Sequence, residues 1–169
     1  MSPPPRTLIA CVGNIFLGDD GFGVEVARRL SAHPLPDGVQ VADFGIRGVH
    51  LAYELAEKAY ESTILVDATA RGGAPGTVYL IEPDPGGWIA GDGGSDATDA
   101  HGMDPRAVFG LVRTLGGTPG RVLLVGCEPA SVEEEMGLSE PVAAAVDEAV
   151  ALILDVLKRG ARDVPCDSR

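Results

Sequence analysis

The sequence predicts an α/β fold in three layers: a twisted, mostly parallel, five-stranded sheet with one antiparallel edge strand and helices on both faces. Three observations support this prediction. Short, continuous apolar runs are typical of strands buried on both faces of a parallel sheet. Between most of these runs lie segments whose apolar residues recur at helical spacing. One connection is too short for a crossover helix. No linker divides the 169 residues, so we expect one domain over 1–169, with flexible tails at 1–6 and about 161–169.

The composition limits the classes of partner. Lys and Arg number 13 against 25 Asp and Glu, for a formal net charge of −12. This charge argues against a nucleic acid or an anionic membrane as partner and permits a metal or a basic protein. No signal peptide and no membrane-spanning apolar run is recognisable, so we expect a cytoplasmic protein. The three cysteines show no zinc-like spacing; Cys11 and Cys127 are expected to be buried structural thiols.

The first predicted strand and helix enclose a glycine-rich loop. The strand covers the apolar run at 8–12. The helix is expected over 21–32, because Phe22, Val26 and Leu30 recur at intervals of four residues. The loop between them has the sequence GNIFLGDDG. Because the carboxyl ends of strands border the ligand crevice of an open α/β sheet, this loop is the first candidate for chemistry.

The residues of this loop favour a cation over a phosphate. Gly13 and Gly18 have the spacing of a phosphate-binding loop, but Asp19 and Asp20 stand where lysine and serine or threonine are needed. The glycine spacing does not match a dinucleotide-binding turn either, so we expect no nucleotide. One aspartate suffices to cap the following helix, which is the commoner use of Asp at such a position. The other remains for chemistry, and we assign Asp20 to that role.

The second and third predicted strands enclose a second helix. An alternating segment at 39–44 predicts a strand, and a helix is expected to begin near Gly48. A fully apolar strand follows at 64–66 and ends at Asp67. The residues expected on the buried side of the helix are Leu51, Leu55 and Ala59.

The fourth predicted strand, at 78–81, is expected to run antiparallel at an edge of the sheet. The connection at 68–76 is too short and too rich in Gly and Pro for a helix, whereas parallel neighbours need a dozen or more connecting residues. Its pairing partner stays undetermined. The long irregular stretch that follows contains aspartates but lacks the spacing of an EF-hand, so we expect no calcium loop there.

Two further helices and a fifth strand complete the prediction. The third helix is expected to begin at Pro105 with Asp104 as its cap, and an apolar strand follows at 122–125. Ser139 is expected to cap the last helix, which ends in a Lys-Arg-Gly sequence. The residues expected on the buried sides of these helices are Val108, Leu111, Val112, Leu115, Val142, Val146, Ala149, Ile153 and Val156.

Three potential metal ligands share the carboxyl edge of the predicted sheet. Asp20 follows the first strand, Asp67 ends the third, and His101 lies in the loop before the third helix. Two carboxylates and an imidazole suit Ni, Zn, Mn or Fe, and three protein ligands leave positions open for substrate or water. Each residue also has an ordinary alternative, as an exposed loop histidine or a turn-forming aspartate. His33 is expected to interact with a helix dipole, and His50 to lie on the surface or in packing.

The sequence resembles the endopeptidases that mature nickel-iron hydrogenases. The resemblance extends from about residue 8 to residue 157 and rests on five matches in order. These are GNIFLGDDGFGV, DFGIRGVHLAYEL, LVDA, a histidine in a loop, and GCEPASVEEEMGLS before the last helix. It implies an enzyme that removes a short C-terminal extension from the hydrogenase large-subunit precursor after nickel insertion. It also implies that Asp20, Asp67 and His101 contact nickel that the substrate supplies.

The resemblance implies further site residues in the first two motifs. Asp43 is expected to act as a base or an orienting group, so the predicted catalytic residues are Asp20 and Asp43. Asn14, Gly45 and Arg47 are expected to contact the substrate. The second motif of the family often has the sequence DGG, whereas here an aromatic residue replaces its first glycine.

The mechanism leaves alternatives open. Neither a GxSxG elbow nor an HExxH helix is present, so serine and zinc protease mechanisms have no support. We expect the substrate's nickel to hold the scissile bond beside a carboxylate that activates water. A maturation chaperone or checkpoint protein that binds nickel without cutting would use the same ligands. A nucleotide-binding regulatory domain is disfavoured by the adjacent aspartates at 19 and 20. The expected partner is the hydrogenase large-subunit precursor.

Overall fold

The computed structural model describes residues 6–82, 105–118 and 120–160. Within these residues, five strands form one sheet in the order β2-β1-β3-β5-β4. The strands are β1 (Thr7–Val12), β2 (Val39–Gly45), β3 (Ser62–Ala68), β4 (Val78–Ile81) and β5 (Arg121–Cys127). The helices are α1 (Phe22–Ser31), α2 (Gly48–Glu57), α3 (Pro105–Thr114) and α4 (Glu140–Arg159), and a short 3-10 helix η1 (Gly18–Gly21) precedes α1.

The strand directions confirm the predicted sheet. β1 runs parallel to β2 and β3, and β3 runs parallel to β5. β4 lies at the edge and pairs with β5 in antiparallel orientation, which identifies the partner that the sequence left undetermined. The short connection from β3 explains this direction, because a chain without a crossover helix can only turn back along the sheet.

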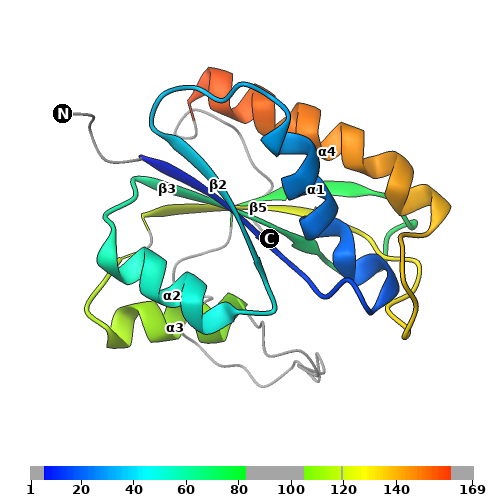
Figure 1. The fold of residues 1–169 in the computed structure, drawn as a ribbon, viewed down its shortest axis with the longest axis horizontal. Helices are drawn as coiled ribbons and strands as arrows, with labels where there is room; N and C mark the ends of the chain where they lie inside the picture. The colour runs from blue at the N-terminus through cyan, green and yellow to red at the C-terminus, as the bar shows by residue number, and fades with distance from the viewer. Residues whose placement is uncertain (1–5, 83–104, 119, 161–169) are drawn as a thin grey trace.

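Helices cover both faces of the sheet, so the predicted three-layer α/β fold is confirmed (Figure 1). α1 and α4 lie on one face, and α2 and α3 lie on the other. Alternate residues of β1 serve the two faces: Ile9 belongs to the core under α1 and α4, whereas Leu8 belongs to the core under α2 and α3. Both side chains are fully buried, and burial of such a side chain stabilises the fold by roughly 1.5–3 kcal/mol.

Two residues predicted to lie on buried helix faces are instead exposed. α2 ends at Glu57 and its C-cap Lys58 is extended, so Ala59 lies beyond the helix and is exposed. α3 ends at Thr114, and Leu115 is exposed. In both cases the apolar pattern continues past the point at which the chain leaves the helix toward the next strand. Buried residues that the sequence analysis did not name include Ala52, Tyr60 and Phe109. Val108, Val112 and the predicted stripe of α4 are buried as expected.

The connections of the sheet diverge at its carboxyl edge. From β1 the chain continues to β2 at one side, whereas from β3 it continues to β4 and then β5 at the other side. The connections therefore diverge between the carboxyl ends of β1 and β3, and open α/β sheets bind their ligands at such a point. Asp20 follows β1 and Asp67 lies near the end of β3. Among the described helices, none is both long and apolar enough to cross a membrane.

Candidate functional site

Glycines bring the loop after β1 into close contact with the helix that follows it. Gly13 has φ of +146°, and a Cβ there would lie 2.0 Å from the carbonyl oxygen of Asp20. A Cβ on Gly23 would lie 2.2 Å from the carbonyl oxygen of Val12. Any side chain at these two positions would therefore push the loop and α1 away from the sheet. This close approach holds Asp20 above the end of β1.

Asp20 is held by a hydrogen bond across its own loop. The backbone N–H of Asn14 donates to Oδ2 of Asp20 at 2.8 Å. The Asp20 side chain belongs to η1 and is half-buried. The bond restricts the orientation of the carboxylate, so part of the cost of ordering a ligand-binding group is met by the folded loop itself.

Asp67 and Asp20 are close enough to interact electrostatically. Burial, together with the negative charge of Asp20, raises the pKa of Asp67 well above its usual range, while a hydrogen bond from the Ala68 N–H opposes the shift. Two carboxylates that repel each other at the edge of a sheet gain from a cation placed between them. The structure therefore brings together two of the three predicted ligands at an edge that suits a metal ion.

The third predicted ligand, His101, lies outside the described residues. No group of three or more His, Cys, Asp and Glu side chains is arranged to hold a metal within 6–82, 105–118 and 120–160. The aspartate pair is thus an incomplete coordination set in this part of the chain, and the role of the histidine stays a prediction.

Asp43 lies at the end of β2, directly beside β1. It is paired in register with Cys11 of β1, and burial together with the charge of Asp43 raises the pKa of the Cys11 thiol. Oδ1 of Asp43 accepts the backbone N–H of Gly45 at 2.8 Å. Arg47 donates to the backbone carbonyls of Phe44 and Asp43, at 3.2 and 3.0 Å. Asp43 and Arg47 are exposed at the same edge of the sheet as Asp20.

Neither loop aspartate caps α1, which corrects the expectation drawn from the sequence. The N-cap of α1 is Gly21, and no side chain hydrogen-bonds there. Asp19 points instead toward the segment before α4 and is 1% exposed. Its carboxylate accepts bonds from the N–H of Ala130, Ser131 and Ser139 and from the Ser139 hydroxyl. Burial alone would raise the pKa of Asp19, but these four bonds outweigh it and lower the pKa.

Ser139 stands at the N-cap of α4 as predicted, although its side chain does not bond to the helix backbone. Its hydroxyl donates to Asp19 at 2.8 Å instead. The predicted position is therefore confirmed, whereas its capping hydrogen bond is absent. The Asp19 side chain joins the loop after β1 to the start of α4 across a separation of 120 residues.

A second buried carboxylate, Glu128, was missed by sequence reasoning. It is 4% exposed and follows β5 directly. It accepts bonds from the N–H of Arg71, the N–H of Gly73 and the hydroxyl of Tyr79. It therefore holds the connection between β3 and β4 against the sheet. The available signal was an acidic residue immediately after a fully apolar strand.

The comparisons with known proteins identify a family for this chain. The model of the hydrogenase maturation protease family matches residues 24–156. The hydrogenase expression/formation protein HupM of Azotobacter chroococcum is 33% identical over 164 residues, which cover 95% of this chain and 76% of that protein.

Two solved structures share the fold over nearly the whole chain. The hydrogenase maturating endopeptidase HybD from Escherichia coli has a TM-score of 0.74 and 29% identity, covering 91% of this chain and 93% of that one. The hydrogenase 2 maturation peptidase from a Thaumarchaeota archaeon has a TM-score of 0.68 and 35% identity, covering 90% and 98%. With its sequence matched over most of its length and its sheet superimposed on theirs, the chain belongs to the hydrogenase maturation protease family and is an endopeptidase of that family.

Proposed function

We propose that the protein, acting as one endopeptidase domain, removes the C-terminal extension of a nickel-iron hydrogenase large-subunit precursor after nickel insertion, and that it recognises the nickel carried by this substrate. The observation that carries the proposal is the interaction of Asp20 and Asp67 at the carboxyl edge of the sheet, where β1 lies beside β3. The membership of the hydrogenase maturation protease family supplies the type of reaction and of partner.

The electrostatics of the aspartate pair supports recognition of a cation on the substrate. In the free protein, burial and mutual repulsion make the charged state of Asp67 unfavourable. The divalent nickel of the precursor would offset both effects, so the contribution of this aspartate pair to binding is available only when nickel has been inserted. Carboxylate oxygens together with an imidazole suit nickel. We therefore propose His101 as the third ligand, and nickel as part of the substrate.

The reaction that we propose is hydrolysis of a peptide bond of the precursor that lies beside the nickel bound by Asp20, Asp67 and His101. A carboxylate takes a proton from water, the water oxygen attacks the scissile carbonyl carbon, and the C–N bond breaks as the leaving amine is protonated. Asp20 is the first candidate for this base and Asp43 the second, either as base or as orienting group. Asn14, Gly45 and Arg47 border the same edge and are proposed to contact the substrate chain.

The deciding experiment is the intact mass of a nickel-loaded precursor before and after incubation with this protein, next to a nickel-free precursor. We expect loss of a C-terminal peptide from the loaded precursor alone. A stable complex with no change of mass would instead support a maturation chaperone or checkpoint that binds nickel without cutting. Equal cleavage of both precursors would contradict nickel recognition and leave the protease activity in place.

A further inference from the structure

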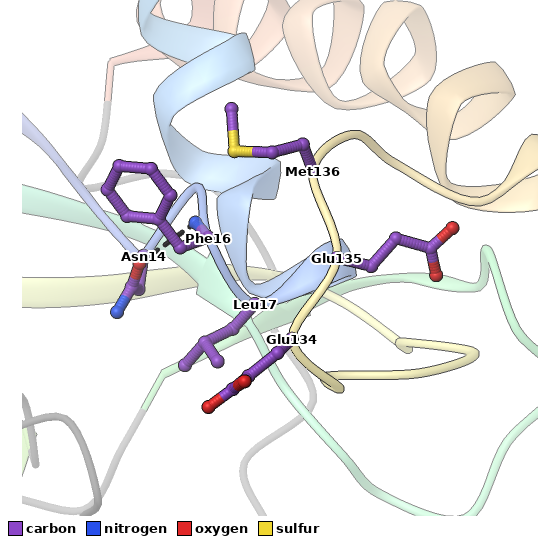
Figure 2. Close-up of a pocket in the computed structure, with 6 residues that line it drawn as sticks. All are labelled: Asn14, Phe16, Leu17, Glu134, Glu135 and Met136. Carbon is purple, nitrogen blue, oxygen red and sulfur yellow. Dashed lines mark hydrogen bonds between the residues drawn. The ribbon is translucent and has the colours of Figure 1, made fainter.

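Two exposed apolar side chains from distant parts of the chain line one pocket beside the candidate site. Phe16, in the loop after β1, is 63% exposed, and Met136, in the loop after β5, is 64% exposed. With Asn14, Leu17, Glu134 and Glu135 they line a pocket of about 490 Å³. In Figure 2 the Met136 side chain extends from its loop toward Phe16, and Glu134 lies near Leu17. Large apolar side chains gathered at an open pocket are typical of a binding surface.

The two walls of the pocket are fixed to each other through their backbones. The N–H of Gly18 donates to the carbonyl of Glu135 at 2.7 Å, and the N–H of Glu135 donates to the carbonyl of Phe16 at 3.1 Å. Leu17 and Glu135 thereby form a parallel β-bridge. The hydrogen bonds of Asp19 to Ala130 and Ser139 further connect the loop after β1 to the segment before α4. A pocket with walls fixed in this way binds a ligand without a large cost for ordering its loops.

The pocket is continuous with the candidate nickel-contacting site through Asn14. The backbone N–H of Asn14 donates to Asp20 at 2.8 Å, and its side-chain oxygen accepts the N–H of Phe16 at 2.9 Å. Asn14 thus bonds both to the carboxylate proposed to bind the substrate and to the backbone of Phe16, whose side chain lines the pocket. A chain bound at Asp20 would pass within a few residues of Phe16.

The lining indicates what kind of segment fits. The apolar part of the pocket is lined by Phe16, Leu17 and Met136. The unbranched side chain of Met136 can adapt to ligand side chains of different shapes. Glu134 and Glu135 add negative charge, directly after Glu133 in the sequence. The whole chain carries a net charge of −12, so a second copy of this protein would be repelled from this surface. A segment that combines an apolar and a cationic side chain complements it.

We propose that this pocket is a docking subsite for the precursor chain, and that it takes an apolar side chain of the precursor flanked by Lys or Arg. The subsite deepens the function proposed above and rests on it for the identity of the partner. The pocket contacts the polypeptide of the precursor and not its nickel. It is therefore expected to bind nickel-loaded and nickel-free precursor equally. Nickel at Asp20 and Asp67 then adds to a contact that the pocket has already made.

The test measures the dissociation constant of the nickel-loaded and the nickel-free precursor with matched pairs of variants. Phe16→Ala and Met136→Ala are expected to weaken binding of both precursors. For Phe16→Ala we expect a loss of roughly tenfold, because the variant removes an aromatic side chain that the bound precursor would cover. Val132→Ala is the control, since Val132 is 48% exposed on the same loop as Met136 and does not line the pocket. We expect its binding to match the native protein.

The acidic part of the pocket has its own matched pair. Glu134→Gln is expected to weaken binding by a few fold and to reduce its salt dependence, because it removes one attractive charge. Glu133→Gln makes the same change of charge one residue away and outside the pocket lining, and a smaller effect is expected. For the Phe16 and Met136 variants, cleavage should show a raised KM with little change of kcat, since the contact lies away from the scissile bond.

The outcomes separate the pocket from the catalytic proposal. Unchanged precursor binding by Phe16→Ala and Met136→Ala would overturn the subsite, as would an equal loss in Val132→Ala or no precursor binding by the native protein. Binding that depends on Phe16 without any change in precursor mass would support the subsite and count against the proteolytic function. Circular dichroism of every variant confirms that it is folded before its binding is interpreted.

Discussion

Two adjacent aspartates of the loop after β1 occupy very different environments. Asp19 is 1% exposed and accepts four hydrogen bonds from the segment at 130–139. Asp20 is half-buried, accepts the N–H of Asn14, and its charge acts on Asp67. A carboxylate whose oxygens are occupied by protein donors stabilises structure, whereas one that faces another carboxylate remains available to a cation. Identical side chains one residue apart therefore have different environments, because Asp19 contacts the segment at 130–139 whereas Asp20 contacts Asn14 and acts on Asp67.

The largest expected effect is on activity, from Asp20→Asn. The amide retains an oxygen for the Asn14 N–H but loses the charge that grips a cation and the basicity that activates water. We expect cleavage of nickel-loaded precursor to fall by at least roughly 10²-fold. The midpoint of urea unfolding should change little. Normal cleavage by this variant would remove Asp20 from the mechanism and break the contrast with Asp19.

Asp19→Asn should have the opposite signature, with a large effect on stability. In the native protein the N–H groups of Ala130 and Ser131 donate to Oδ2 of Asp19. In the variant an NH2 group can take the place of this oxygen, so these donors lose their acceptor. We expect the free energy of unfolding to fall by about 3 kcal/mol, measured by urea denaturation. The surviving folded fraction should still cleave. A stability equal to that of the native protein would show that the four bonds contribute little.

Glu128→Gln extends the comparison to the second buried carboxylate. It keeps one oxygen for Arg71, Gly73 and Tyr79 where two are now in use. We expect a loss of about 2 kcal/mol in the free energy of unfolding, and faster proteolysis at 69–77 than in the native protein. Tyr79→Phe serves as the control, because it removes one of the bonds and leaves the carboxylate. A larger loss in the control than in Glu128→Gln would contradict the assignment.

Asp67→Asn is expected to change the stability less than Asp19→Asn and Glu128→Gln do, and in the opposite direction. Removing one of two repelling carboxylates should raise the free energy of unfolding by about 1 kcal/mol, as is common when a functional site is relieved of strain. The Ala68 N–H keeps its acceptor in the amide. Cleavage of nickel-loaded precursor should fall at the same time. A variant that is both less stable and fully active would contradict the proposed role of the pair.

Much of the fold was predictable because it depends on local patterns. The apolar runs at 8–12, 64–66 and 122–125 are the central strands, and the short connection at 68–76 sets the direction of β4. Helix ends were less predictable. Ala59 and Leu115 fit the helical spacing, yet they are exposed, because a periodic pattern doesn't specify where the chain must leave the helix to reach the next strand.

The candidate site was predictable only in part. Placing Asp20 and Asp67 at one edge followed from strand ends in a parallel sheet. Their electrostatic contact needed the strand order, which puts β1 beside β3. The pocket of Phe16 and Met136 could not be predicted from the sequence. Its walls come from the loop after β1 and the loop after β5, and no local sequence pattern indicates that these two loops are in contact.

The sequence by itself determined the type and order of the elements, the direction of the edge strand and the family, because these depend on residue spacing along short segments. The tertiary structure decided which of two neighbouring aspartates serves the fold. The bonds of Asp19 reach donors 111 to 120 residues away, and only the folded sheet brings those groups together. Burial and hydrogen bonding act on distances in space, so identical residues next to each other in the sequence can be given different chemistry.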